Sequence, residues 1–298
     1  MSTFRYAVNG NWYKGNTHIH SVASDGGKTF DELSRMYRAA GYDFLFRTDH
    51  WVASNVTTDQ SDYPLLWLDG IELDGSDSSG AYYHVVCLGT DGTSARMLER
   101  ERGFVEALEA AREQGALLIL AHPYWTGNSL EDSLRWGFDG VEVYNHICHW
   151  LNGKGSGGVH WNWLLQREPR TLGLAVDDAH IRPEHPGWNG GWMMVNALNC
   201  TRAAILEALR RGAFYSTQGP EFRRIESEDG RICVETSPVR FLRLVGPAHE
   251  GARIGSYDGG TFSEATIEVP PDWAYAYLEI EDTQGRCAWT NALYVPEQ

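Results

Sequence analysis

Nine side chains of the kinds that bind metal ions are spread along the first two thirds of the chain, some of them in closely spaced pairs. In order, they are His18, His20, Asp25, His50, Glu72, His84, His122, Asp178 and His180. Residues two apart in a strand point to the same face, so His18 and His20 can reach one ion, as can Asp178 and His180. Imidazole nitrogens and carboxylate oxygens suit zinc, manganese or iron. The pattern therefore predicts a metal centre.

The elements that must position these residues follow from the alternation of apolar runs and helical patterns between about residues 13 and 215. The predicted helices are 30–40, 101–114 and 201–211, and each ends at a glycine. The predicted strands are 42–46, 116–121, 140–144 and 171–176. This alternation predicts an α/β fold with parallel strands and crossover helices, either a barrel or an open sheet. The barrel is favoured because the candidate ligands follow the carboxyl ends of strands.

After Gln218-Gly219-Pro220 the hydrophobic pattern changes to a period of two. The runs concerned are 231–235, 241–245, 265–269 and 275–280, with turn-prone pairs such as Asp229-Gly230 between them. We therefore expect two domains, an α/β domain over 1–218 that carries the candidate metal ligands and a small all-β, sandwich-like domain over 219–298. The second holds no candidate ligand, so packing or oligomerisation is favoured for it over substrate recognition.

Composition excludes several classes of protein. The chain has 298 residues, of which 42% are hydrophobic and 22% charged, and a net charge of −15. Nucleic acid and anionic membranes need basic surfaces, so the expected partner is a small-molecule substrate. The five cysteines are scattered, and neither a signal peptide nor a membrane-spanning run is evident. We expect a soluble cytoplasmic protein; its oligomeric state stays open.

Six motifs in a fixed order carry a resemblance to a known family. They are His-x-His-x-x-x-Ser-Asp-Gly at 18–26, Thr-Asp-His at 48–50, Gly-x-Glu at 70–72, the isolated His84, Ala-His-Pro at 121–123 and Asp-Ala-His at 178–180. The chain thereby resembles the PHP (polymerase and histidinol phosphatase) superfamily of metal-dependent phosphoesterases. Residues 177–180, 212–220 and 288–291 are further similar to a branch with a β-rich tail that includes hydrolases of the carbaryl-hydrolase type.

The resemblance implies a distorted PHP-type (β/α)7 barrel followed by a small all-β domain. It also implies two to three divalent ions (Mn, Zn or Fe) as cofactors. The implied ligand sets are His18, His20, Glu72 and Asp178 for the first ion, Glu72, His84 and His122 for the second, and Asp25, His50 and His180 for the third. Such a set leaves open positions for water and substrate, as a hydrolytic rather than structural site requires.

Two residues beside the Thr-Asp-His motif are further catalytic candidates. Asp49 precedes a ligand and could orient it, or it could be an ordinary strand-end aspartate. Arg47 could bind an anionic substrate, or it could pair with a carboxylate of the protein.

The segment 145–163 is aromatic and glycine-rich and follows a predicted strand, as a mobile lid would. It contains His146, His149 and His160, and a histidine there could protonate a leaving group because imidazole titrates near neutral pH. His149 is the candidate selected.

Three functions remain open on the sequence. The leading hypothesis is hydrolysis of a small phosphate mono- or diester by a metal-activated water. The second is hydrolysis of a carbamate, carboxylic ester or amide, which is favoured by the aromatic residues Trp51, Tyr124 and Trp125 that follow ligands and by the scarcity of cations near them. The third is a non-catalytic metal-binding protein.

Overall fold

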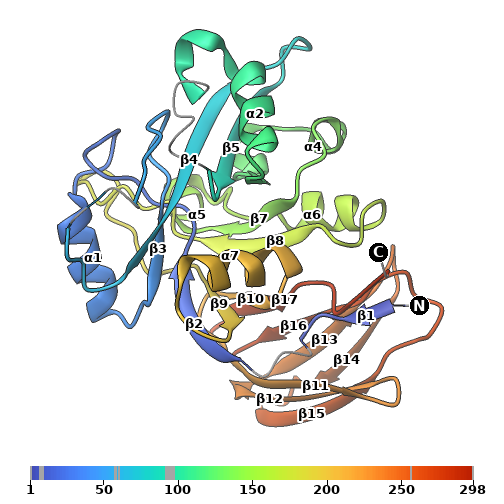
Figure 1. Ribbon diagram of the computed structural model, residues 1–298. Coiled ribbons are helices and arrows are strands. Elements are labelled where there is room, and N and C mark those ends of the chain that lie inside the picture. The colour runs from blue at the N-terminus through green and yellow to red at the C-terminus, as the bar shows by residue number, and fades with distance from the viewer. Residues whose placement is uncertain are drawn as a thin grey trace.

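The computed structural model describes residues 2–6, 10–56, 59, 61–90, 98–255 and 257–296. Most strands in this part of the chain form one large sheet (Figure 1), in the order β14-β13-β16-β17-β10-β9-β2-β3-β4-β5-β6-β7-β8. Its strands up to residue 217 are β2 Asn11–Asn16, β3 Phe44–Arg47, β4 Leu66–Ser76, β5 Tyr82–Leu88, β6 Leu117–Leu120, β7 Gly140–Asn145, β8 Leu172–Val176, β9 Trp192–Ala197 and β10 Phe214–Thr217. The short strands β3, β6 and β8 are buried at every position, which explains their unbroken apolar runs.

The sheet is mixed: the predicted parallel strands are present, and antiparallel strands that the sequence did not predict lie among them. Strands β2, β3 and β4 are parallel neighbours, as are β6, β7 and β8. Strand β5, however, is antiparallel to both β4 and β6, and β9 is antiparallel to β2 and β10. The link between β4 and β5 is short, and a short link joins antiparallel strands, whereas parallel ones need a crossover.

Strand β8, at one edge of the sheet, lies near β2, which is in the middle of the strand order. Beyond their ends, Ile19 and Ala179 form an isolated parallel bridge. The hydroxyl of Ser216 on β10 also contacts β8, donating to Gly173 O and accepting from Ala175 N–H (2.8 and 2.9 Å). These contacts bring β8 close to β2 and β10, but β2 and β8 share no ladder of backbone hydrogen bonds among the described residues. A mixed α/β fold is shown; a closed barrel is not.

The helices are α1 Phe30–Ala39, α2 Phe104–Glu113, α3 Pro123–Thr126, α4 Leu130–Arg135, α5 His146–Asn152, α6 Gly158–Leu165 and α7 Arg202–Arg211. A capping box formed by Thr29 and Glu32 begins α1, and Gly212, with a φ of 70°, ends α7. The helix predicted over 101–114 is interrupted at Gly103, whose φ is 96°, and is divided into a 3₁₀ turn (η2, Arg100–Arg102) and α2. No described helix is both long enough and apolar enough to cross a membrane.

The C-terminal residues form two β layers (Figure 1). Their strands are β11 Phe222–Glu228, β12 Arg231–Val239, β13 Phe241–Val245, β14 Gly251–Gly255, β15 Phe262–Glu268, β16 Tyr277–Glu281, β17 Cys287–Thr290 and, paired with β1 Ser2–Phe4, β18 Tyr294–Pro296. Strands β11, β12 and β15 make a separate sheet. One apolar cluster, including Ile232, Val234, Leu242 and Leu278, lies between this sheet and β13 and β16. Packing of this kind is typical of a sandwich.

The large sheet is continuous across the predicted domain boundary at residues 218/219. Strand β10, the last element of the first predicted domain, pairs with β17 through residues 215–217 and 288–290. Strand β17 in turn pairs with β16. The β-rich part is therefore attached to the α/β part by backbone hydrogen bonds as well as by the chain itself.

Candidate metal centre

The nine predicted ligands meet at one edge of the large sheet. His18 and His20 follow β2, His50 follows β3, His122 follows β6, and Asp178 and His180 follow β8. The carboxyl ends of parallel strands share an edge, so these side chains converge. His84 reaches the same edge from near the beginning of β5, because an antiparallel strand begins where its parallel neighbours end.

Glu72, in the middle of β4, lies at the centre of the cluster and is buried. The shortest distances from its carboxylate oxygens to imidazole nitrogens are 3.0 Å for His18, 3.2 Å for His20, 3.4 Å for His50, 2.7 Å for His84 and 3.5 Å for His122. Oxygen Oε2 contacts the first three and Oε1 the last two. The two oxygens of one carboxylate thus contact two different sets of imidazoles.

Asp178 and Asp25 extend the cluster to either side of His20. Asp178 Oδ1 lies 3.1 Å from His20 Nε2 and 3.3 Å from His18 Nε2. Asp25 Oδ2 lies 3.1 Å from His180 Nε2, and Asp25 Oδ1 lies 3.4 Å from His20 Nδ1. All three implied ligand sets are therefore brought together.

Four groups of potential ligand atoms, each with its atoms within 4.8 Å of one another, occur among the described residues. They are His20, Asp25, His50 and His180; His18, His122 and Asp178; His18, His20 and Glu72; and His50, Glu72 and His84. Every predicted ligand belongs to at least one group, and four residues belong to two. Because the groups share members, they form one continuous cluster of potential ligands rather than separate ones.

The charges of the cluster stabilise one another. Burial opposes ionisation of Glu72, but the neighbouring charges of His18, His50 and His84 hold its pKa well below the usual range. Burial likewise works against charging His20, yet hydrogen bonds to Asp178 and Glu72 raise its pKa to about 10. His18, whose pKa is also raised well above its usual value by the neighbouring carboxylates, and His20 therefore carry protons near neutral pH unless another cation replaces them.

The second nitrogen of several ligand histidines is held by an oxygen outside the cluster. Glu142 Oε1 lies 2.6 Å from His18 Nδ1, and Thr126 Oγ1 lies 3.0 Å from His122 Nδ1. His180 Nδ1 lies 2.9 Å from the carbonyl oxygen of Asp178. An acceptor there orients the ring and makes the other nitrogen the free ligand atom.

Two acidic residues beside the ligands, Glu142 and Asp74, were not singled out from the sequence; Asp74 Oδ1 lies 3.3 Å from His50 Nδ1. Glu142 is buried on β7, and its Oε2 accepts hydrogen bonds from the backbone N–H of His122 (2.9 Å) and from Asn145 Nδ2 (2.8 Å). Asn145 Nδ2 also donates to Asp178 Oδ2 (3.1 Å). The available signal was an acidic residue inside a strand whose six positions are all buried, since such a residue needs partners.

Backbone strain is concentrated at the same place. Seven described residues other than glycine have a positive φ, and four of them are ligands or direct neighbours of ligands: Trp51, His122, Asp178 and Ile181. Such conformations cost of order 1 kcal/mol or more and persist where the surrounding structure imposes them.

Of the other predicted catalytic residues, Asp49 is buried and forms hydrogen bonds to the loop that follows His20. Its Oδ1 accepts from the N–H groups of Ser21 (2.8 Å) and Ser24 (3.1 Å), and its Oδ2 accepts from the Ser21 hydroxyl (2.8 Å). Asp49 belongs to none of the four ligand groups. Its contacts fit a role in positioning the loop that carries Asp25.

Arg47 and His149 lie apart from the ligand groups. Arg47 is buried, forms an ion pair with Asp59, and has its guanidinium 4.2 Å from the centre of the Phe30 ring. His149 is exposed in the last turn of α5, with its ring 5.7 Å from that of Tyr144. The ion pair is the alternative that the sequence left open for Arg47, and a catalytic role for either residue stays a prediction.

The predicted lid at 145–163 is largely helical: α5 and α6 occupy most of it. His160 is buried and places its Nε2 2.9 Å from Asn128 O. A histidine outside this segment comes closer to the ligands, because the ring of His185 lies 5.6 Å from that of His180. His185 was not singled out from the sequence, where nothing marks its fold-back onto His180.

The donor set fits divalent metal ions. Six imidazoles and three carboxylates converge, with shared ligands and oriented rings, and this is the chemistry that zinc, manganese and iron bind. Without ions, burying so many ionisable groups together would be unfavourable.

Metal binding is expected to release protons, because imidazolium cannot coordinate. As pH rises towards the His20 pKa of about 10, the neutral fraction increases, so the apparent affinity should rise about tenfold per pH unit for each proton displaced. Calorimetric titration with Mn²⁺ in buffers of different ionisation enthalpy measures this release. An affinity that stays constant between about pH 6 and pH 8 would contradict the assignment of protonated ligands.

Comparison with known proteins places this geometry in a structural context. No protein-family model matches the chain. No curated protein matches it either. Among solved structures, it is similar to a two-domain protein from Bacteroides vulgatus that contains a predicted PHP-like metal-dependent phosphoesterase, with 16% identity over 92% of this chain and 91% of that one and a TM-score of 0.56.

Two further solved structures are less similar. One is a candidate metal-dependent phosphoesterase from Bifidobacterium adolescentis (15% identity, 68% of this chain and 98% of that one, TM-score 0.45). The other is an amidohydrolase from Chromobacterium violaceum with bound sulfate and no metal (16% identity, 66% and 96%, TM-score 0.44). The likeness to the Bacteroides protein shows that this chain shares the fold of a protein with a PHP-like part, and the predicted resemblance is confirmed at the level of the fold. The carbaryl-hydrolase-type branch stays a prediction.

Proposed function

We propose that this protein is a PHP-type metal-dependent hydrolase that cleaves a small phosphate mono- or diester. The observation that carries the proposal is the position of Glu72, whose two carboxylate oxygens lie between five imidazoles that belong to overlapping ligand groups. A structural metal site closes around one ion, whereas this one extends over several positions along the edge of the sheet. Under this proposal the strands β2–β8 form the PHP-type barrel, which is completed by the bridge between Ile19 and Ala179.

Two to three divalent ions (Mn, Zn or Fe) at these positions would supply a water of lowered pKa and positive charge that stabilises the transition state. The chain's own residues orient the ligands: Glu142 holds His18, Thr126 holds His122, and Asn145 holds Asp178.

Two cations near the site are suited to bind the phosphate oxygens. Lys154 places its ammonium 5.6 Å from the centre of the Tyr124 ring, two residues after the ligand His122. Arg182 follows His180 by two residues, and its Nε is 4.0 Å from Glu184. Arg47, the third cation considered from the sequence, is already paired with Asp59. Lys154 and Arg182 are therefore the residues proposed to hold an anionic substrate.

A second candidate function, hydrolysis of a carbamate, carboxylic ester or amide, is supported by aromatic residues around the cluster. The ring of Trp125 lies 5.1 Å from that of His122 and that of Tyr82 lies 5.5 Å from that of His84, and both aromatic side chains are exposed. Exposed apolar side chains gathered beside a site typically mark a binding surface. An aryl leaving group would fit such a surface. The third candidate is a metal-binding protein without catalytic activity.

Hydrolysis rates on four matched p-nitrophenyl substrates distinguish these functions. The Mn²⁺-loaded protein is expected to hydrolyse the phosphate monoester or diester, and a His50→Ala variant, which lacks a shared ligand, is expected to fall to background. Turnover of the carboxylic ester or carbamate alone would replace the proposal by the second candidate. No turnover of any substrate, with metal bound, would favour the non-catalytic protein.

A further inference from the structure

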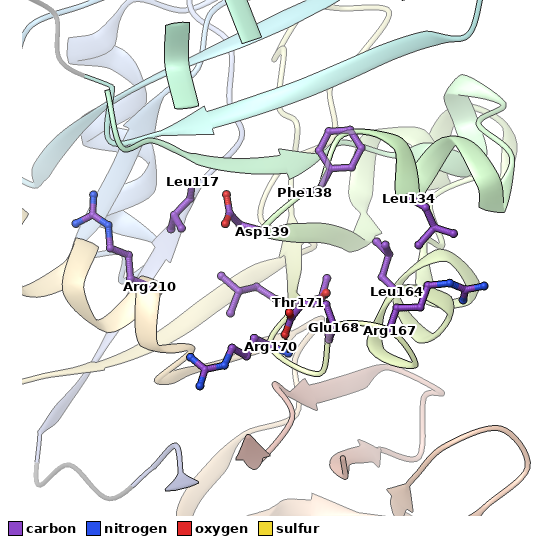
Figure 2. A pocket seen from close by; sticks show the side chains of 12 residues that line it. Leu117, Leu134, Phe138, Asp139, Leu164, Arg167, Glu168, Arg170, Thr171 and Arg210 are labelled. Carbon is purple, nitrogen blue, oxygen red and sulfur yellow. Dashed lines mark hydrogen bonds between the residues drawn. The ribbon is translucent and has the colours of Figure 1, made fainter. Parts of the chain in front are cut away.

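A cavity of about 500 Å³ lies at the end of the sheet opposite the metal centre (Figure 2). Leu117 and Leu172, which line it, are the first residues of β6 and β8, and Asp139 directly precedes β7. The predicted ligands His122 and Asp178 follow the opposite ends of β6 and β8. From Leu172 to Asp178 the chain advances six residues, or roughly 20 Å at the rise of a strand. We call this cavity the base pocket; it cannot be part of the metal centre.

The base pocket has an apolar wall. Phe138, Leu164 and Leu172 are buried beneath it, and Leu134 on α4 is half-buried beside them. Figure 2 shows Phe138, Leu134 and Leu164 on one side of the opening. The volume of the base pocket lies within the range of about 300 to 1,000 Å³ that is typical of small-molecule sites.

The polar lining is positively charged in a chain that is strongly acidic overall. Arg167, Arg170 and Arg210 contribute three positive charges, and Asp139 and Glu168 contribute two negative ones, a surplus of one (3 − 2 = 1). Asp139 is in part already satisfied, since it accepts from Leu118 N–H (2.8 Å), and burial raises its pKa. Against a net charge of −15 for the whole chain, a local positive surplus is an exception.

A further cation adjoins this lining from inside the protein. Arg5 is about nine-tenths buried, and its Nη2 donates to Arg170 O (3.0 Å), but its Nε and Nη1 have no hydrogen-bond partner in the described part of the chain. A Cβ added to Gly212 would clash with Arg5 Nη1 and lie 3.1 Å from Leu172 Cδ2, so the guanidinium lies directly behind the pocket wall. Burial lowers the pKa of Arg5 to about 10, and the charge of Arg170 acts in the same direction. An anion nearby would relieve this repulsion.

We infer that the base pocket binds a small organic carboxylate with an apolar body, its head group beside Arg170 and Arg210 and its body against Phe138, Leu134 and Leu164. A guanidinium binds a carboxylate through paired N–H donors, and the surplus of one positive charge matches a monoanion. Since the pocket lies at the far end of β6–β8, the bound molecule leaves the metal centre open. It stabilises the folded chain by mass action.

Calorimetric titration of the metal-loaded, full-length protein with octanoate tests this inference. Octylamine, with the same apolar body and the opposite charge, and acetate, with the same head and no body, are matched probes. Octanoate is expected to bind, and both matched probes to bind at least about tenfold more weakly. Arg210→Glu reverses one charge of the lining and should weaken octanoate at least about tenfold, whereas the exposed Arg253→Glu should leave it unchanged.

Leu134→Trp fills the cavity from its half-buried edge and should remove binding independently of charge. Octanoate could instead coordinate ions at the metal centre, and His50→Ala separates the two cases because it changes only that centre. Binding that survives His50→Ala and is lost in Leu134→Trp supports the base pocket. The inference is overturned if octanoate does not bind in the millimolar range, or if binding survives both pocket variants. None of these outcomes depends on the proposed hydrolase activity.

Discussion

Replacing Glu72 by glutamine is expected to lower kcat/KM on the preferred p-nitrophenyl substrate at least about 1,000-fold and to reduce the number of bound ions. The amide keeps the size of the side chain but removes the negative charge shared by five imidazoles. It also presents an N–H₂ group where an ion needs a lone pair. Loss of metal-derived charge stabilisation amounts to several kcal/mol, and each 1.4 kcal/mol is a factor of ten in rate.

The measurements are steady-state kinetics and metal analysis of the purified variant after dialysis against Mn²⁺. Glu207→Gln, an exposed glutamate on α7, is the matched control and should retain both activity and metal content. If Glu72→Gln kept the full metal content and the wild-type rate, Glu72 would not be the bridging ligand, and the proposed centre would have to be reassigned.

The second large effect is expected at Glu142, which contacts a ligand instead of the ions. Glu142→Gln should weaken Mn²⁺ binding about 10- to 100-fold, the usual effect of removing such an orienting partner. The cause is local: Oε1 lies 2.6 Å from His18 Nδ1, and an amide cannot both accept from that ring and keep its oxygen for the His122 N–H. The His18 ring would lose its preferred tautomer and orientation.

Activity measured against Mn²⁺ concentration distinguishes this positioning role from a catalytic one. A positioning residue changes the metal concentration needed for half-maximal activity, and saturating metal should restore most of kcat. Glu113→Gln, an exposed glutamate at the end of α2, serves as the control. An unchanged metal requirement in Glu142→Gln would show that the short contact to His18 does not orient the ligand.

The two predictions differ in how visible their residues are in the sequence. Glu72 stands in a motif, Gly-x-Glu, at the centre of a familiar order of ligands. Glu142 has no motif, and its partner His18 is 124 residues away in the chain. Partners at such separation are set by which strands become neighbours, and no local pattern encodes that choice.

The proposed metal centre and the base pocket lie at opposite ends of the strands. Residues after the carboxyl ends of the strands carry the chemistry, and residues before their amino ends line a cavity with no ligand-type cluster of its own. This division is the usual one in α/β folds, where loops at one edge of the sheet vary with function and the other edge maintains the scaffold. The base pocket would be an exception, since it places recognition on the scaffold side.

The sequence by itself determined the elements with strong local signals. Helix α1 was predicted from apolar spacing and a terminal glycine, and α7 from the same features; both begin and end within two residues of the expected positions. The buried strands β3, β6 and β8 were recognised because uninterrupted apolar runs of this length have few alternatives. The nine candidate ligands were found from their residue types, their spacing and the order of their motifs.

The tertiary structure decided everything that depends on long-range pairing. It made β5 antiparallel and thereby brought His84 to the ligand edge from the beginning of a strand. It joined β10 to β17 across the expected domain boundary, and it gave Arg47 the partner Asp59. It also turned most of the expected lid into helices. Hydrophobic periodicity and caps act over a few residues, whereas sheet order, charge pairing and cavities follow from contacts between segments far apart in the chain.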